Sequence, residues 1–370
     1  FGMAEPESMM AVAPYIAPIA LMIILFDSGL AMNITKMIYE SPRAILLSTV
    51  NFILSILLVS VSMNLVFSWS YMHGALLGAI VGGTSSIMVI GLLKGTKASQ
   101  HASNLLILES AITDVLVVVT SIAIIDLLVA NVEFSMLEMS RVLLGNFSIG
   151  IVFGLIWSAV WIYIASKFHT NSSTPMFALA SVFILYPVAT VFGGSGEIAT
   201  LVFGIILGNS NKLLCMAKIK CEQLNLAETR IFHTEISFFV RTFFFVYLGT
   251  IVSTQDILLI LVGFLLGLML VFARRFGVLL STIGSRLAPE RQLLEAIAPR
   301  GLAAAVVAQL PFAYGLQYGR EYVDLTLAVI IATAIFSSVM VWLWRRSQPE
   351  EQAVAQSPAK KQAKKAKKQD

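Results

Sequence analysis

The chain has 370 residues, of which 58% are hydrophobic and 12% are charged, and its mean hydropathy is +0.85. Soluble domains carry about 25% charged residues, so this composition excludes an ordinary soluble protein and indicates a membrane protein with several spans. The formal net charge of +4 does not indicate nucleic-acid binding, because six lysines lie within the last eleven residues. We expect residues 347–370 to form a disordered, basic cytoplasmic tail, which either contacts anionic lipid or is simply solvated.

Residues 1–346 are expected to form one transmembrane domain. A helix needs about 17 to 25 apolar residues to cross a bilayer, and eleven runs come close to this length. They lie near 9–26, 43–66, 74–93, 103–130, 142–166, 174–192, 196–211, 236–254, 256–284, 292–312 and 323–344. Basic residues such as Lys36, Lys94 and Lys167 gather in alternate loops, which the positive-inside rule places in the cytoplasm. The sequence therefore predicts an all-α protein of the cell membrane with about 11 transmembrane helices, its amino end outside and its carboxyl end in the cytoplasm.

Two of the runs contain residues that suit a helix interior poorly. The third run includes GGTSS at 82–86, and the tenth includes PRG at 299–301. Gly and Pro weaken the helical hydrogen-bond ladder and allow an unwound stretch whose free backbone groups can meet an ion. Interrupted helices at corresponding places in two halves are typical of transporters built from inverted repeats. Runs two to four and nine to eleven would be these repeats; the alternative is a close helix crossing built on small residues.

The fourth run carries two carboxylates, Glu109 and Asp114. Each costs roughly 3 kcal/mol at bilayer depth on insertion scales, so each is expected to have a function or a partner. On a helix Ser110 lies four residues from Asp114, and Thr113 lies beside them, so two hydroxyls and a carboxylate form an oxygen pocket for a small cation or a proton. The alternative is a buried salt bridge that only fixes helix register, which is favoured for Glu109 but not for Asp114.

The ninth run places Arg274 and Arg275 within an otherwise apolar stretch. Adjacent helical residues point about 100° apart, so one guanidinium can face the carboxylates while the other needs a separate partner. At least one of them should pair with Glu109 or Asp114. Arg241 lies near or within the eighth run, and of these two readings we favour the one in which it is close enough to the cytoplasmic end for its side chain to extend to the interface.

These residues resemble the monovalent cation:proton antiporter superfamily, which includes the sodium/proton exchangers, and the resemblance covers nearly the whole chain. The sequence ESAITDV at 109–115 is similar to the family's ES..ND or DD signature. This implies that Asp114 binds the cation and the proton in competition and that Ser110 is a ligand. Thr113 stands where the family usually has Asn or Asp.

Two further segments carry the resemblance. The sequence GGTSSIMV at 82–89 resembles the exchangers' ATDPVAV, which implies that Thr84 is a ligand although the usual acid is missing. The sequence FDSGL at 26–30 resembles the family's F-E-G-G-L, in which the acid, here Asp27, lies near the ion path. Additional matches are Gly194-Ser195-Gly196, FFFVYLG at 243–249, Arg274 and Pro299-Arg300-Gly301.

The resemblance implies an inverted-repeat antiporter fold with two discontinuous crossing helices. Family members commonly have thirteen helices, so eleven fit the loss or absence of an amino-terminal hairpin. We expect a core of helices at about 43–130 and 256–344, and scaffold helices at about 9–26 and 142–254. The resemblance also implies a homodimer through the scaffold.

The resulting hypothesis is secondary antiport of a monovalent cation, Na+ in the first place, against H+, one for one, by competition at Asp114. The predicted cation and proton site contains Asp114, Ser110, Thr84, Thr113 and Asp27, and the predicted charge compensation comes from Glu109, Arg274, Arg275 and Arg300. We expect no enzymatic activity and no cofactor besides the transported ions. The alternatives are a K+/H+ antiporter, a cation channel and a sodium-coupled solute symporter.

Overall fold

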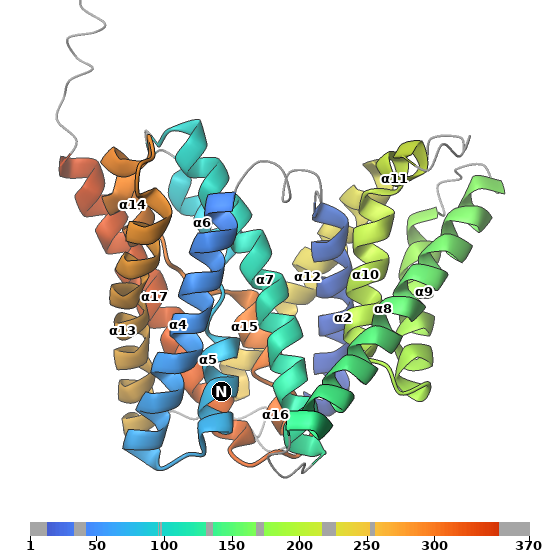
Figure 1. Cartoon of the computed structure of the whole chain (residues 1–370), viewed down its shortest axis with the longest axis horizontal. Helices are drawn as coiled ribbons and strands as arrows, with labels where there is room; N and C mark the ends of the chain where they lie inside the picture. The colour runs from blue at the N-terminus through green and yellow to red at the C-terminus, as the bar shows by residue number, and fades with distance from the viewer. Residues whose placement is uncertain are drawn as a thin grey trace, which may run out of the picture.

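The computed structural model describes residues 13–32, 42–94, 96, 98–130, 136–167, 174–216, 227–251 and 256–347. Within these ranges every regular element is a helix, and the helices stand side by side in a wide bundle (Figure 1). Six of them are long and apolar enough to cross a membrane: α4 (Pro42–Phe67), α7 (Gln100–Val129), α8 (Met136–Lys167), α9 (Thr174–Val191), α13 (Ile257–Thr282) and α17 (Gly319–Ser347). Residues 348–370 of the predicted tail lie outside the described ranges.

Shorter or more polar helices occupy the other predicted runs. They are α2 (Ala13–Ala31), α10 (Gly196–Gly208) with α11 (Ser210–Met216), and α12 (Ala227–Ile251). The α12 helix begins nine residues before the predicted run, because its first turns carry charged residues such as Glu228 and Arg230 that hydropathy excludes. Each of the eleven predicted runs thus coincides with a helix or an interrupted helix in the described part of the chain.

Two runs are interrupted, as predicted. The first consists of α5 (Tyr71–Ile80) and α6 (Ser86–Leu93), separated by an unwound stretch at 81–85. The second consists of α14 (Arg291–Ala296), α15 (Leu302–Val307) and α16 (Leu310–Ala313), preceded by the short 3-10 helix η1 (Ala288–Glu290). Its main break lies at 297–301, and each interrupted run stands between two long helices in the sequence.

The two unwound stretches touch each other. The backbone N–H of Ser85 donates a hydrogen bond of 2.8 Å to the carbonyl oxygen of Pro299, while the Ser85 side chain accepts one from the Met88 N–H and so caps α6. A Cβ atom on Gly301 would collide with the side chain of Ser85. Glycine at this position therefore permits the crossing of the two broken helices.

The helices pack into two groups. One contains α4, α5, α7, α13, α14 and α17, and the other contains α2, α8, α9, α10 and α12. A buried apolar cluster that includes Phe26, Trp161 and Phe203 fills the second group. The α2 helix also packs against α15 and α16, so these two segments of the second broken helix lie near the boundary between the groups, toward the middle of the bundle (Figure 1).

Candidate functional site

Asp114 lies in the middle of α7, where the first broken helix packs against it. Ser86, the first residue of α6, donates a hydrogen bond of 2.9 Å from its hydroxyl to Oδ2 of Asp114. One turn earlier on α7, the buried Ser110 Oγ lies 3.2 Å from Ser86 Oγ and 3.1 Å from the carbonyl oxygen of Thr84. Carboxylate, hydroxyl and backbone carbonyl oxygens therefore converge at this break.

A small cavity opens onto this group. Its volume is about 40 Å³, which is room for a few water molecules at most, and Asp114 is only half-buried. The lining residues are Ile24, Ser28, Ser85, Ser86, Ile87, Asp114, Arg241 and Ala303. They come from both helix groups, so a water molecule or a small, partly hydrated ion can reach the carboxylate at the boundary between the groups.

The predicted ligands Thr84 and Thr113 pair with each other. The Thr84 N–H donates to Thr113 Oγ1 over 3.1 Å, and the two hydroxyl oxygens are 3.3 Å apart. Thr113 Oγ1 also donates to the carbonyl oxygen of Ser110. Among the described contacts neither threonine hydroxyl reaches the Asp114 carboxylate. Thr113 points elsewhere because neighbouring positions on α7 point about 100° apart, and the Thr84 hydroxyl contacts Thr113 instead. The direct hydroxyl partner is Ser86, which the sequence analysis did not select although it belongs to the GGTSS segment.

Glu109 and Arg274 form a buried ion pair. The guanidinium donates from both terminal nitrogens to the two carboxylate oxygens, over 2.5 and 2.6 Å, and its Nε donates to the carbonyl oxygen of Leu294. Both side chains are 1% exposed. The prediction that one of the adjacent arginines pairs with Glu109 or Asp114 is confirmed, and the salt-bridge alternative favoured for Glu109 is the correct one.

Arg275 does not compensate charge at the site as predicted, whereas Arg300 lies close enough to Glu109 to interact with its charge. Arg275 points away from α7 and lies 3.4 Å from Glu295, with 58% of its side chain exposed. The buried Arg300 donates to the carbonyl oxygen of Gly82 over 2.7 Å, and its backbone N–H donates to Thr333. Gly82 is the second residue after α5, whose carboxyl end carries partial negative charge. Arg300 therefore stabilises the broken helix in addition to its interaction with Glu109.

Asp27 on α2 also has a basic partner. Arg241 of α12 donates to Oδ2 of Asp27 over 2.9 Å, and Thr234 donates to Oδ1 over 3.2 Å. The expectation that Arg241 extends to the cytoplasmic interface is wrong, because this acid lies opposite it on the neighbouring helix. Among the described ion pairs, Glu109 and Asp27 each have an arginine, whereas Asp114 has none.

A second polar cluster lies toward the carboxyl end of α7, and the sequence analysis did not single it out. Asn146 of α8 donates to Oδ2 of Asp126 over 3.0 Å and thereby joins the two helix groups. Glu197 directly follows the Gly194-Ser195-Gly196 segment and accepts hydrogen bonds from Tyr186 and Ser195 over 2.6 and 2.8 Å. The polar residue Glu197 at the start of an apolar helix is the signal that could have indicated this cluster.

Comparisons with known proteins show which family the sequence resembles. The family described as "Sodium/hydrogen exchanger, transmembrane" matches residues 2–346. The K(+)/H(+) antiporter NhaP2 of Shewanella baltica is 26% identical over 328 residues, which cover 86% of this chain and 55% of that protein. The Na(+)/H(+) antiporter 1 of Methanocaldococcus jannaschii is 26% identical over 318 residues, which cover 82% of this chain and 71% of that protein. The chain thus spans little more than half the length of the first of these relatives.

The fold has a known counterpart as well. The structure of the sodium proton antiporter MjNhaP1 from Methanocaldococcus jannaschii is similar with a TM-score of 0.72 and 23% sequence identity, over 92% of this chain and 85% of that one. This likeness confirms the predicted antiporter fold. Together with the match over nearly the whole length, it places the chain in the sodium/hydrogen exchanger family of transmembrane proteins.

Proposed function

We propose that the protein is a secondary antiporter that exchanges a monovalent cation for a proton, one for one, by competition at Asp114. The observation that carries this proposal is a half-buried carboxylate at the crossing of two broken helices, hydrogen-bonded by a hydroxyl and open to a small cavity. Family membership and the antiport activities named for the relatives support it. An enzymatic activity is not part of the proposal.

The cation is held by Asp114 with the hydroxyls of Ser86 and Ser110 and the backbone carbonyl of Thr84. In the proton-bound state Ser86 keeps its contact with the carboxylate; in the cation-bound state its oxygen turns toward the ion instead. Thr113 holds Thr84 in place, since it accepts the Thr84 N–H. One carboxylate cannot bind the metal cation and the proton at the same time, so binding of either one releases the other.

The charges of the neighbouring acids support one-for-one exchange. Arg274 neutralises Glu109, and Arg241 neutralises Asp27. This leaves Asp114 as the one carboxylate of the described site that can change its occupant, and a single changing charge predicts electroneutral turnover. Na+ and K+ are both candidates, because relatives named for each cation are 26% identical to this chain.

Alternating access is a movement of the group with the broken helices, the core, against the group with α2, α8, α9, α10 and α12, the scaffold. The cavity beside Asp114 lies between these groups toward α6 and the carboxyl end of α2. At the opposite end Asn146 links α7 to α8, and this link has to break when the site opens there. We further propose a homodimer through the scaffold, an external amino end and a cytoplasmic carboxyl end in the cell membrane.

Proteoliposomes test the proposal. Na+, K+ or Li+ is added to vesicles with an imposed pH gradient, and the dissipation rate is compared between the natural protein, Asp114→Asn and Asp256→Asn. Asp256 is an exposed residue just before α13 whose side chain makes no capping bond, so this variant is the matched control. We expect Asp114→Asn to lose about a hundredfold or more of the rate, because a hydrogen-bonded charge contributes about 3 kcal/mol.

The same assay separates the alternatives. Exchange by Asp114→Asn at the natural rate would reject competition at this residue. Turnover driven by an imposed membrane potential would reject the one-for-one ratio. A channel would conduct cations without any opposing proton flux, and a symporter would accumulate an organic solute with sodium.

A further inference from the structure

A cavity of about 630 Å³ lies near the carboxyl end of α17, whose Trp344 belongs to the same apolar cluster as Leu105 and Leu287 of the cavity lining. It shares no lining residue with the cavity beside Asp114. It is bounded by the beginnings of α4 and α7 and by the link from α13 to η1. Ligand pockets typically measure about 300 to 1,000 Å³, so this volume suits a molecule rather than an ion. The antiport mechanism makes no use of it.

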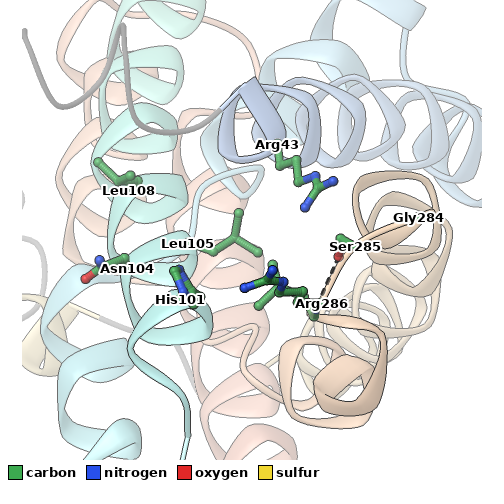
Figure 2. A pocket seen from close by; sticks show the side chains of 9 residues that line it. Arg43, His101, Asn104, Leu105, Leu108, Gly284, Ser285 and Arg286 are labelled. Carbon is green, nitrogen blue, oxygen red and sulfur yellow. Dashed lines mark hydrogen bonds between the residues drawn. The ribbon is translucent and has the colours of Figure 1, made fainter.

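Three basic side chains face this space from three different elements. Arg43 extends from α4, His101 from the first turn of α7, and Arg286 from the link after α13, and all point toward the same hollow (Figure 2). Gly284, with φ +63°, makes the turn that places Arg286 there. Asn104 and Ser285 add neutral polar groups at its edge, and the described lining contains no carboxylate.

Some of the charged side chains around the cavity already have hydrogen-bond partners within the protein, and others form no described ion pair. Glu290, the carboxylate nearest to Arg286 in sequence, accepts hydrogen bonds from the N–H and the hydroxyl of Ser99 over 2.8 and 2.7 Å. Arg291 donates to Thr282 over 2.6 Å. Arg43 and Arg286, in contrast, form no ion pair with any described residue. Within the described part of the chain, no carboxylate neutralises these two arginines, so both can bind an anion in the cavity.

The lining also has an apolar part. Leu105 and Leu287, only 3% and 7% exposed, and the partly buried Leu108 line the cavity beside the arginines. Arginine binds phosphate oxygens through its planar set of donors, and leucines suit the carbon atoms attached to a headgroup. Arginines that served only to orient the protein in the membrane would need neither a cavity nor buried leucines beside it.

We propose that this cavity binds the phosphate group of an anionic molecule, with Arg43 and Arg286 as the phosphate ligands and His101 and Asn104 beside them. The leucine floor favours a phospholipid headgroup over free phosphate. The proposed cytoplasmic location agrees with this, because anionic lipids are concentrated in that leaflet. A bound headgroup would connect α4, α7 and the end of α13, all of which belong to the core.

The test uses the purified full chain in detergent, with the thermal unfolding midpoint measured against increasing amounts of three probes. Dioleoylphosphatidylglycerol in mixed micelles represents the lipid, glycerol 3-phosphate represents a soluble phosphate, and dioleoylphosphatidylcholine is the uncharged-headgroup control. The variants are Arg43→Gln with Arg286→Gln, and, as a matched control, Lys94→Gln with Arg346→Gln. The control removes two exposed charges at the same end of the bundle, where Arg345 contacts the carbonyl oxygen of Lys94.

We expect phosphatidylglycerol to stabilise the natural protein and the control variant. The cavity variant should bind it about thirtyfold more weakly, since each basic residue contributes about 1 kcal/mol to anionic lipid binding.

If glycerol 3-phosphate raised the unfolding midpoint as much as the lipid does, and the cavity variant lost this effect, the site would be assigned to soluble phosphates. Equal loss in the control variant, or no protection by either anion, would overturn the proposal. If the glutamine variant does not fold, Arg43→Lys with Arg286→Lys keeps the charge but not the planar donors, and it should bind with an intermediate loss. Cation exchange is not measured here, so failure of this test leaves the proposed antiport untouched.

Discussion

The α7 helix carries two carboxylates five residues apart, and their surroundings are opposite. Glu109 is 1% exposed and is bound at both oxygens by Arg274. Asp114 is half-buried, receives one hydroxyl hydrogen bond from Ser86 and faces a cavity. Both are acids at membrane depth, yet one is fully engaged within the protein and the other can exchange its partner.

In the proposed mechanism, this difference separates a structural acid, Glu109, from a transporting one, Asp114. A buried ion pair gains stability only while both members are present, because removal of either leaves an uncompensated charge in a medium of low polarity. A carboxylate that binds and releases ions has to avoid such a permanent partner. In the proposed mechanism, the arginines paired with Glu109 and Asp27 leave Asp114 as the carboxylate at which cation and proton compete.

The largest effect is expected from breaking the Glu109 ion pair. Arg274→Gln or Glu109→Gln should lower the free energy of unfolding by about 3 to 5 kcal/mol, because one buried charge loses its partner. Asp114→Asn should change it far less. The thermal unfolding midpoint of each purified variant measures this. The double variant Glu109→Gln with Arg274→Gln is the control, since it leaves neither charge of the pair unpaired and should be more stable than Arg274→Gln alone. If Asp114→Asn lowered the free energy of unfolding as much as Glu109→Gln does, the two acids would not differ in the way described.

A smaller effect is expected from Ser86, which the structure places at the open carboxylate. Ser86→Ala removes a hydroxyl that binds Asp114 and, in the proposed mechanism, the cation. A hydrogen bond to a charged group contributes about 1.5 to 3 kcal/mol, so the cation concentration for half-maximal exchange should rise about tenfold to a hundredfold.

The matched control for this change is Ser338→Ala, because Ser338 is on α17 and donates only to the carbonyl oxygen of Ala334 one turn earlier. Exchange in proteoliposomes as a function of cation concentration provides the measurement. An unchanged half-maximal concentration in Ser86→Ala would show that this hydroxyl does not bind the ion.

A third acid of α7 extends the comparison to the far end of the helix. Asp126 is bound by Asn146 across the boundary between core and scaffold. Asn146→Ala should remove about 0.5 to 1.5 kcal/mol from the state seen here and favour opening at that end. Hydrogen–deuterium exchange of peptides from the ends of α7 and α8 should become faster. Asn104→Ala, at the other end of α7, should leave those peptides unchanged.

The spans and the breaks in them could be predicted because they depend on local sequence. Hydropathy over about twenty residues locates an apolar helix whatever lies beside it, and the GGTSS and PRG segments interrupt their helices through missing backbone hydrogen bonds and free hydroxyls. The carboxylates on α7 were also visible, since a charge in an apolar run stands out. Local patterns therefore indicated the spans, their two breaks and the carboxylates on α7, while the resemblance to the exchangers indicated the antiporter fold.

The partners of these charges could not be predicted because they lie on other helices. Whether Arg241 extends to the interface or binds Asp27 depends on how α12 packs against α2, which no local pattern contains. The contact of Ser86 rather than Thr84 with Asp114 depends on how α6 is rotated after the break. Spacing along one helix says which residues share a face, but it does not say what that face meets.

The smallest effect is expected from Arg275, the neighbour of the arginine that binds Glu109. Its guanidinium is largely exposed and pairs with Glu295 at 3.4 Å, and exposed pairs of this kind contribute about 0.2 to 1 kcal/mol. Arg275→Gln should therefore shift the unfolding midpoint only slightly, and leave the exchange rate unchanged, whereas the identical substitution one residue earlier removes a buried partner. Arg274→Gln and Arg275→Gln remove the same charge from the same helix turn. The difference between their unfolding midpoints therefore measures the effect of burial and of the partner's geometry. If Arg275→Gln proved as destabilising as Arg274→Gln, the assignment of one arginine to the core and the other to the surface would be wrong.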